Sequence, residues 1–299
     1  MRKKGFTLVE ILVAIVLASI ILIAVVGLYI ASDRSFKKTK PVSDVLEEMR
    51  SGIATLDFVF SRWGAGVPCY NNTCSIGSTI PACSGYPPTD PMCMICNDGD
   101  LANGCSDIEF YANLYGLGFV VNATGSFANI ISCRLSTTDN QNCYYIWQGG
   151  KVVNYNSTAT LPPAYGFNVN FDSIDCINFS GSPNLTIDNP IMCQWINGTL
   201  DCDNNNTYSL QAGDVIIRVP HKVRFYVAQD TDGSYWLMMD KTDMESGCNS
   251  NENALKVARI KDANSFKVYA IGRSVKVVIT FATQGPKEQT FTVERYFGR

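Results

Sequence analysis

Hydrophobic residues are distributed unevenly along the chain, and the longest uninterrupted run lies near its start. Residues 11 to 31 contain no charged side chain. About 20 apolar residues are enough for a helix to cross a bilayer. The pattern therefore predicts a membrane-spanning helix at the N-terminus.

The spacing of apolar residues changes after this run. From residue 42 to 63 they recur at steps of three and four, which indicates an amphipathic helix. Pro41 would start or kink this helix, and Gly64 and Gly66 would end it. We expect the stripe to pack on a sheet; it consists of Val42, Val45, Leu46, Met49, Ile53, Leu56, Phe60 and Trp63.

From residue 214 onward, short runs of β-branched and aromatic residues predict antiparallel strands. Two runs flank a tight turn at Asp232 and Gly233 and predict a hairpin. Pro220 should place the first run at an edge or bend it. Further runs lie at 255–260, 266–271, 274–281 and 290–297. A meander packed on the amphipathic helix is the simplest arrangement, so the expected fold class is α+β.

Residues 65 to 213 are rich in Gly, Pro, Asn, Ser and Cys and show no long periodic stretch. Such a segment buries little apolar area, so we expect disulfides to restrict its unfolded state. The spacing leaves the pairing open, although a turn-like stretch favours Cys133 with Cys143. An even, dense set of cysteines behind a hydrophobic N-terminus is typical of an oxidising compartment. The twelve candidates are Cys69, Cys74, Cys83, Cys93, Cys96, Cys105, Cys133, Cys143, Cys176, Cys193, Cys202 and Cys248.

Cys93 and Cys96 form a CxxC motif, which occurs in redox sites, zinc sites and disulfide scaffolds. A redox role requires a thioredoxin-like setting and a zinc site requires a second pair of ligands, and the sequence shows neither. Two acidic strings, at 97–107 and 201–206, resemble calcium loops but are out of register with the ligand positions. We therefore expect structural disulfides and solvated loops, with no metal and no cofactor.

Charge and motif content argue against two broad functions. The net charge is -3 and the pI is about 5.3, which gives no support to nucleic-acid binding. The chain has one histidine, His221, and no GxSxG, phosphate-loop or HExxH motif. We expect a structural or binding protein and not an enzyme, with redox chemistry at the CxxC motif as the remaining enzymatic alternative.

A short motif precedes the apolar run. Residues 4–10 read KGFTLVE and resemble the cleavage and methylation motif of type IV prepilins. The resemblance implies that a prepilin peptidase cuts between Gly5 and Phe6 and methylates the new amino group of Phe6. It also implies that Glu10 meets the N-terminal amine of a neighbouring subunit. A buried amine and a buried carboxylate are each costly alone, and pairing offsets much of that cost.

The length and the run DFVFSRWGAGVPC at residues 57–69 make the chain similar to the PilW-like minor pilins. The J-type minor pseudopilins of type II secretion are a related alternative. The resemblance implies a pilin-like fold with a long N-terminal helix on an antiparallel sheet and a large disulfide-rich insertion. The expected parts are a leader at 1–5, a transmembrane assembly helix at 6–35, its amphipathic second half at 36–64, a cysteine-rich region at 65–213 and a C-terminal sheet region at 214–299.

The same resemblance implies the partners and the location. The partners are other minor and major pilins, met through the N-terminal helix, together with the prepilin peptidase and an inner-membrane assembly platform. Cations on both sides of the apolar run leave the topology open, but the cysteines and the resemblance place the body in the periplasm. The expected path runs from a single-pass prepilin in the inner membrane to a priming or tip complex at the pilus. A different class of function is an adhesin or ligand-binding module formed by the cysteine-rich region at the tip.

Overall fold

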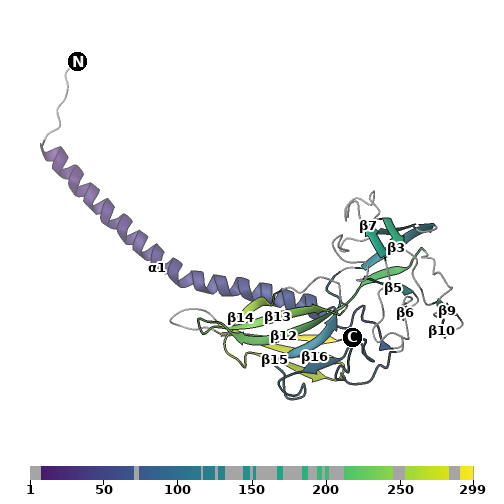
Figure 1. Ribbon diagram of the computed structural model, residues 1–299. Helices are drawn as coiled ribbons and strands as arrows, with labels where there is room; N and C mark the ends of the chain where they lie inside the picture. Colours follow the sequence, from purple (N-terminus) through teal and green to yellow (C-terminus); the bar gives the residue numbers. More distant parts are fainter. Residues whose placement is uncertain are drawn as a thin grey trace.

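The computed structural model describes most of the helix and body, with gaps in the middle of the chain. The described residues are 8–70, 74–115, 117–124, 127–131, 144–148, 151–152, 167–170, 184–187, 194–196, 199–201, 212–244, 253–282 and 290–298. They form one long helix and a set of antiparallel sheets (Figure 1). The expected α+β class is confirmed.

The helix α1 spans Leu8–Phe60, which is 53 residues and therefore about 80 Å. It continues through Pro41, so this proline does not start a separate helix. The loss of one backbone donor at a proline is outweighed here by long helical segments on both sides. Figure 1 shows a gradual curve along the helix.

The helix ends at the predicted place. Backbone N–H groups of Arg62 and Trp63 bond to the carbonyl oxygens of Val59 and Phe60 at 3.0 and 3.1 Å, forming one tight final turn. Gly64 then has a φ of 68°, in the left-handed region that favours glycine. A Cβ on Gly64 would also lie 2.9 Å from Cγ of Met92, so space and backbone geometry both require glycine.

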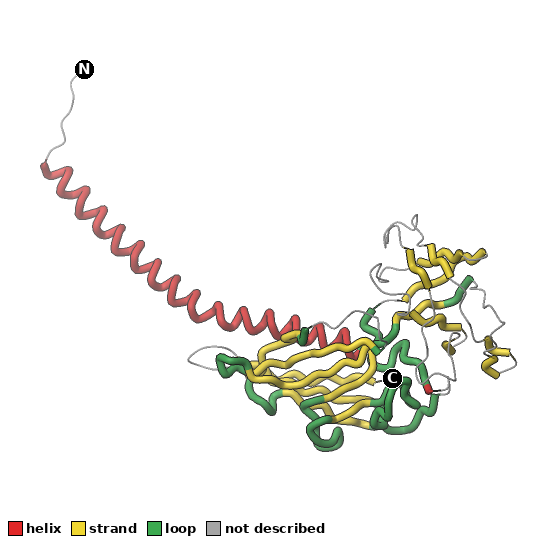
Figure 2. Tube along the Cα trace, viewed as in Figure 1, coloured by secondary structure: helices red, strands yellow, loops and turns green. Residues whose placement is uncertain are grey.

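Two antiparallel sheets form the body that the second half of α1 covers (Figure 2). The first has the order β1-β2-β12-β13-β14 and the second has the order β15-β16-β17. Their strands are β1 (Met94–Cys96), β2 (Ile108–Ala112), β12 (His221–Gln229), β13 (Tyr235–Asp243), β14 (Leu255–Ile260), β15 (Phe266–Ile271), β16 (Ser274–Ala282) and β17 (Thr290–Gly298).

One apolar core joins α1 to both sheets. The ring of Phe60 lies 5.0 Å from Phe110 of β2, 5.7 Å from Phe225 of β12 and 4.8 Å from Phe297 of β17. The helix therefore contacts both sheets through a single side chain. The predicted stripe is confirmed, because Val45, Leu56, Phe60 and Trp63 are buried and Val42, Leu46, Met49 and Ile53 are partly buried.

The C-terminal strands do not form one meander, which corrects the simplest arrangement. The hairpin β12–β13 is confirmed, and the backbone N–H of Asp230 bonds to the carbonyl of Ser234 at 2.8 Å. After β14, however, the chain turns into the second sheet. Asp262 organises this turn by accepting hydrogen bonds from Asn264 N at 2.9 Å and from Ser265 Oγ at 2.8 Å. Such local hydrogen bonds to an aspartate side chain stabilise turns.

A strand from the cysteine-rich region enters the sheet that α1 covers. β2 pairs with β12 along five residue pairs, so β12 is an interior strand. Beside this pairing, Arg224 of β12 donates to both carboxylate oxygens of Asp107, at 2.8 and 2.6 Å. Pro220 separates β12 from β11 (Val215–Arg218) and marks the predicted bend.

The rest of the described chain forms two further antiparallel sheets. One has the order β6-β5-β11-β3-β4-β8-β7 and the other pairs β10 with β9. Their strands besides β11 are β3 (Leu117–Thr124), β4 (Phe127–Ile131), β5 (Tyr144–Gln148), β6 (Lys151–Val152), β7 (Phe167–Asn170), β8 (Asn184–Ile187), β9 (Gln194–Ile196) and β10 (Thr199–Asp201).

Candidate functional site

The N-terminal half of α1 is the first candidate site. Its residues Leu8–Lys37 are long and apolar enough to cross a membrane, and none of the segment is buried within the chain. Large apolar side chains are exposed all along it, among them Leu8, Leu22 and Leu28. Contiguous apolar surface of this extent marks a site that contacts lipid or other proteins. The predicted cleavage site, Gly5 and Phe6, lies outside the described residues.

Glu10 lies in the first turn of α1, and its side chain is exposed. The helix dipole favours a negative charge at this end. Within lipid or a helix bundle, however, a carboxylate also requires a cationic partner to offset its desolvation. The arrangement can therefore bind an amine that another molecule supplies.

Three disulfides cross-link the segment from Cys69 to Cys105, which follows the helix. They join Cys69 to Cys74, Cys83 to Cys93 and Cys96 to Cys105, with Cα–Cα distances of 5.1, 4.9 and 5.8 Å. Cys93 and Cys96 of the CxxC motif are therefore bonded to different partners. This is the pattern of a disulfide scaffold, whereas in a CxxC redox site the two cysteines of the motif bond to each other. The other six candidates, including Cys133 and Cys143, lie outside the described residues.

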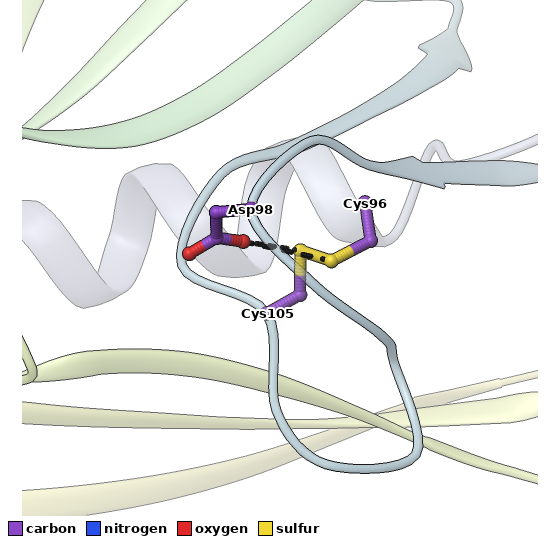
Figure 3. Close-up of side chains that lie close together, drawn as sticks. All are labelled: Cys96, Asp98 and Cys105. Carbon is purple, nitrogen blue, oxygen red and sulfur yellow. Dashed lines mark hydrogen bonds between the residues drawn. A yellow bond between two sulfur atoms is a disulfide. The ribbon is translucent and has the colours of Figure 1, made fainter.

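Cys96, Asp98 and Cys105 come close enough together to suggest a metal site (Figure 3). Both sulfur atoms are consumed by the disulfide, whereas a cysteine metal ligand is a thiolate. Oδ1 of Asp98 lies 3.0 Å from Sγ of Cys105, and it accepts hydrogen bonds from the backbone N–H groups of Ser106 and Asp107 at 3.0 and 3.2 Å. The cluster is thus a loop-closing arrangement in the oxidised protein.

The acidic string at 97–107 is likewise engaged within the fold. Nδ2 of Asn97 donates to Asp107 at 3.1 Å and to Glu109 at 3.2 Å. Asp100 accepts a hydrogen bond from the backbone N–H of Ala102 at 3.0 Å. These bonds explain the string as a turn and strand-end structure. The second string continues beyond the described residues after Asp201.

A buried polar network, which the sequence did not suggest, lies where β11 passes into β12. Oδ1 of Asp243 accepts a hydrogen bond from Nη1 of Arg218 at 2.8 Å and lies 2.9 Å from Nε2 of His221. The ring of Tyr115 lies against both side chains, with its centre 4.2 Å from the guanidinium carbon of Arg218 and 4.9 Å from the centre of the imidazole of His221. Nδ2 of Asn113 also donates to the carbonyl of Arg218 at 3.0 Å. The network ties the end of β13 to the junction of two sheets.

Burial favours the neutral form of His221 in this network. Burial lowers the pKa of His221 most strongly, Asp243 raises it, and the charges of Arg218 and Lys241 lower it, so the pKa lies below its usual value. Nδ1 has no hydrogen-bond partner among the described residues. A buried lone pair costs less than a buried N–H, so we assign the proton to Nε2, which donates to Asp243. The sequence showed one histidine in a strand, but its contact with Asp243 depends on strand pairing. Asn113 is 105 residues away from Arg218, so it leaves no local pattern either.

An open cavity of about 420 Å³ lies between the exposed side of α1 and β13. Phe58, Leu114 and Met239 provide apolar walls, and Tyr115 and Lys241 line one side. Nζ of Lys241 donates to the hydroxyl of Tyr115 at 3.2 Å, so the polar side is already part of the network around Arg218.

Comparison with known proteins identifies a known motif at the N-terminus. Residues 1–26 match the family model of the prokaryotic N-terminal methylation motif. A protein of Aquifex aeolicus (strain VF5), whose name reads "Uncharacterized protein", is 32% identical over 242 residues, which cover 81% of this chain and 78% of the relative. No solved structure matches the chain. The chain is thus a type IV pilin-like protein and belongs to the same family as the A. aeolicus relative.

Proposed function

We propose that this protein is a minor type IV pilin, of the PilW-like kind, that takes part in pilus assembly within the priming or tip complex. One observation carries the proposal. A single helix of 53 residues joins the methylation motif to a disulfide-bonded body, and its first half is unburied. That half has no packing partner within the described chain and is available to neighbouring subunits.

The shape of the described body supports a position at one end of a filament. Two sheets and the second half of α1 share one core, and a seven-stranded sheet extends from it through β11. A subunit that repeats along a shaft must leave room for identical bodies above and below it. Extra bulk obstructs that packing, whereas a terminal subunit has one side without neighbours.

The chemistry of the N-terminus supports a role in setting the axial offset between the helices of neighbouring subunits. After cleavage the amine would lie at Phe6, four residues before Glu10, which is about 6 Å along a helix axis. If Glu10 of one subunit binds the amine of the next, adjacent helices are offset by about that distance. The pair would then fix the axial position of a newly added subunit.

The remaining proposals concern location and partners. The chain would begin as a prepilin anchored in the inner membrane, where the prepilin peptidase and the assembly platform act on it. Three disulfides support a periplasmic body. Other minor and major pilins would bind the N-terminal helix.

An adhesin role is a second proposal. Within the cysteine-rich region, residues 69–105 are part of the body, because they supply β1 of the first sheet and Met94 belongs to the core. A tip-exposed binding surface would instead use the sheet that contains β3, β4 and β5.

The test is to delete the gene, complement it with the full chain, and localise the protein on sheared pili by immunogold labelling. We expect fewer pili in the deletion strain and label at filament ends. Label spread uniformly along the shaft would contradict a terminal position. Normal piliation with lost protein secretion would favour the J-type pseudopilin role.

A further inference from the structure

A cationic segment follows the apolar half of α1. Arg34, Lys37, Lys38 and Lys40 lie within seven consecutive positions, whereas Asp33 is the one acidic residue between positions 11 and 43. The side chains of Arg34, Lys37 and Lys40 are exposed on the helix. We call residues 34–40 the cationic segment.

Helix geometry places this segment at a membrane surface. The uncharged run at 11–31 is about 31 Å long, which matches a hydrocarbon core of about 30 Å. Arg34 then lies about 4 Å beyond the core, and Lys40 lies about 13 Å beyond it. The headgroup layer is about 5–8 Å deep on each side, and the long lysine side chain can reach back toward it. Arg34, Lys37 and Lys40 therefore lie near the depth of the lipid phosphates.

Two aromatic side chains mark the same boundary. Tyr29 and Phe36 are 73% and 66% exposed. Tyr29, Phe36 and Lys40 are separated by seven and four residues, so they share one face of the helix. Aromatic rings at the edge of a span favour the interface between hydrocarbon and headgroups, and this face would anchor the helix at a defined depth.

The charge of the segment complements anionic lipid. Lys37 forms a 2.8 Å ion pair with Asp33, but both side chains remain largely exposed, at 74% and 42%, and such pairs contribute little. Counting Asp33, an excess of three positive charges remains over positions 33–40. Each Lys or Arg near an anionic surface adds an attraction that is measurable and screened by salt.

We propose that the cationic segment binds the phosphate groups of anionic phospholipids while α1 spans the membrane. The bound lipids fix the depth of the helix and oppose its withdrawal from the bilayer until other subunits replace them. This inference rests on α1 being a membrane span, and it does not depend on which filament receives the subunit.

The experiment uses the full-length protein in mixed micelles of neutral detergent, phosphatidylcholine and phosphatidylglycerol. The ratio of the two lipids that remain bound after purification is measured by mass spectrometry and compared with the bulk ratio. We expect the wild-type protein to enrich phosphatidylglycerol. The variant R34Q/K37Q/K40Q should lower the enrichment by up to about fivefold for each cation removed. For the wild-type protein, added salt should weaken the enrichment of phosphatidylglycerol, and soluble glycerol phosphate should leave this enrichment unchanged.

Two control variants make the outcome specific. R34K/K37R/K40R keeps every charge and should keep the enrichment. R50Q/K261Q/K267Q removes the same number of positive charges from residues outside the segment and should also keep it. A bulk lipid ratio in the wild-type protein would overturn the proposal, and so would full enrichment in R34Q/K37Q/K40Q. Circular dichroism checks that the helix is intact in each variant, and pilus counts then test the proposed function separately.

Discussion

Asp90 and Arg273 form an ion pair between two distant parts of the chain, in which the carboxylate is buried and the guanidinium is partly exposed. Nη1 of Arg273 donates to Oδ2 of Asp90 at 2.8 Å, and Nη2 donates to Oδ1 at 3.1 Å. The carboxylate is 1% exposed. Burial raises the pKa of Asp90, but hydrogen bonds from Arg273 and from Met92 N outweigh it, so the pKa lies below its usual value. The pair holds the disulfide-rich segment against the turn between β15 and β16.

Removing this pair should destabilise the body. Asp90→Asn leaves the partly exposed Arg273 guanidinium without its counter-ion, so we expect the free energy of unfolding to fall by about 1–3 kcal/mol. Denaturant unfolding of the full-length protein in detergent measures the change. Glu294→Gln is the control, because Glu294 pairs with Lys276 on an exposed face and should matter much less. Equal losses in the two variants would show that burial of the Asp90 pair is unimportant.

Close contact between α1 and β14 makes a second prediction. A Cβ on Gly52 would lie 2.6 Å from Cβ of Ala258. Alanine favours a helix by about 1 kcal/mol over glycine, but overpacking costs about 1–3 kcal/mol. We therefore expect Gly52→Ala to destabilise the body by about 1 kcal/mol in the same unfolding assay.

The matched control lies on the same helix. A Cβ on Gly27 meets nothing within 4 Å, so Gly27→Ala should leave the stability of the body unchanged. Combining Gly52→Ala with Ala258→Gly restores the space and should recover most of the loss. If the double variant is no more stable than Gly52→Ala alone, crowding is not the cause.

The sequence predicted the parts of this fold that depend on local pattern. The stripe from Val42 to Trp63, the helix end at Gly64 and the hairpin at Gly233 all arise from spacing or turn chemistry within a few residues. The pairing of β12 with β2 and the Asp90–Arg273 pair depend on segments more than 100 residues apart. Disulfide pairing has the same difficulty, because the six cysteines from Cys69 to Cys105 alone allow fifteen pairings and spacing does not choose among them.

The candidate sites also divide into features that local sequence indicates and contacts that form only in the fold. The motif at residues 4–10 and the apolar run are contiguous, so the sequence alone could indicate them, and the motif model matches residues 1–26. The roles of Gly5, Phe6 and Glu10 stay predictions. The network of Arg218, His221 and Asp243 was missed, because the contact with Asp243 forms only when β13 pairs with β12.

His221 predicts how stability depends on pH. Its pKa in the folded protein lies below the usual value, mainly because of burial, while Asp243 opposes the shift and Arg218 and Lys241 add to it. The unfolded state, with a histidine pKa of about 6.5, therefore binds more protons as the pH falls below that value. Stability should be complete above about pH 7 and decrease below about pH 6.5.

Unfolding at a series of pH values measures this decrease. The chain has one histidine, so His221→Gln should flatten the dependence between about pH 7 and pH 5. The ring of Tyr115 and the charges of Arg218, Lys241 and Asp243 surround the imidazole and remain in this variant. An unchanged slope would mean that other groups titrate in this range.

The cleavage motif predicts a specific mature N-terminus. Prepilin peptidase activity should give a protein that begins at methylated Phe6, which intact-mass and peptide mass spectrometry detect. Gly5→Ala should block processing and leave the five-residue leader in place. Gly27→Ala is the matched glycine control and should be processed normally. Mature protein beginning at Phe6 in the Gly5→Ala variant would refute the predicted cut site.

Glu10 should act after cleavage. Glu10→Ala keeps Gly5 and Phe6, so processing should be normal, but the amine of a neighbouring subunit would lose its buried counter-ion. Breaking a buried pair costs about 3 kcal/mol or more, which corresponds to about a hundredfold weaker capture. Cross-linking to partner pilins and counts of surface pili measure the effect. Glu47→Ala removes another exposed carboxylate from α1 and should leave capture intact. Glu10→Gln separates charge from shape, because the amide keeps the size of the side chain while losing its charge. If Glu10→Gln captured partners as well as the wild-type protein, Glu10 would contribute packing and not an ion pair.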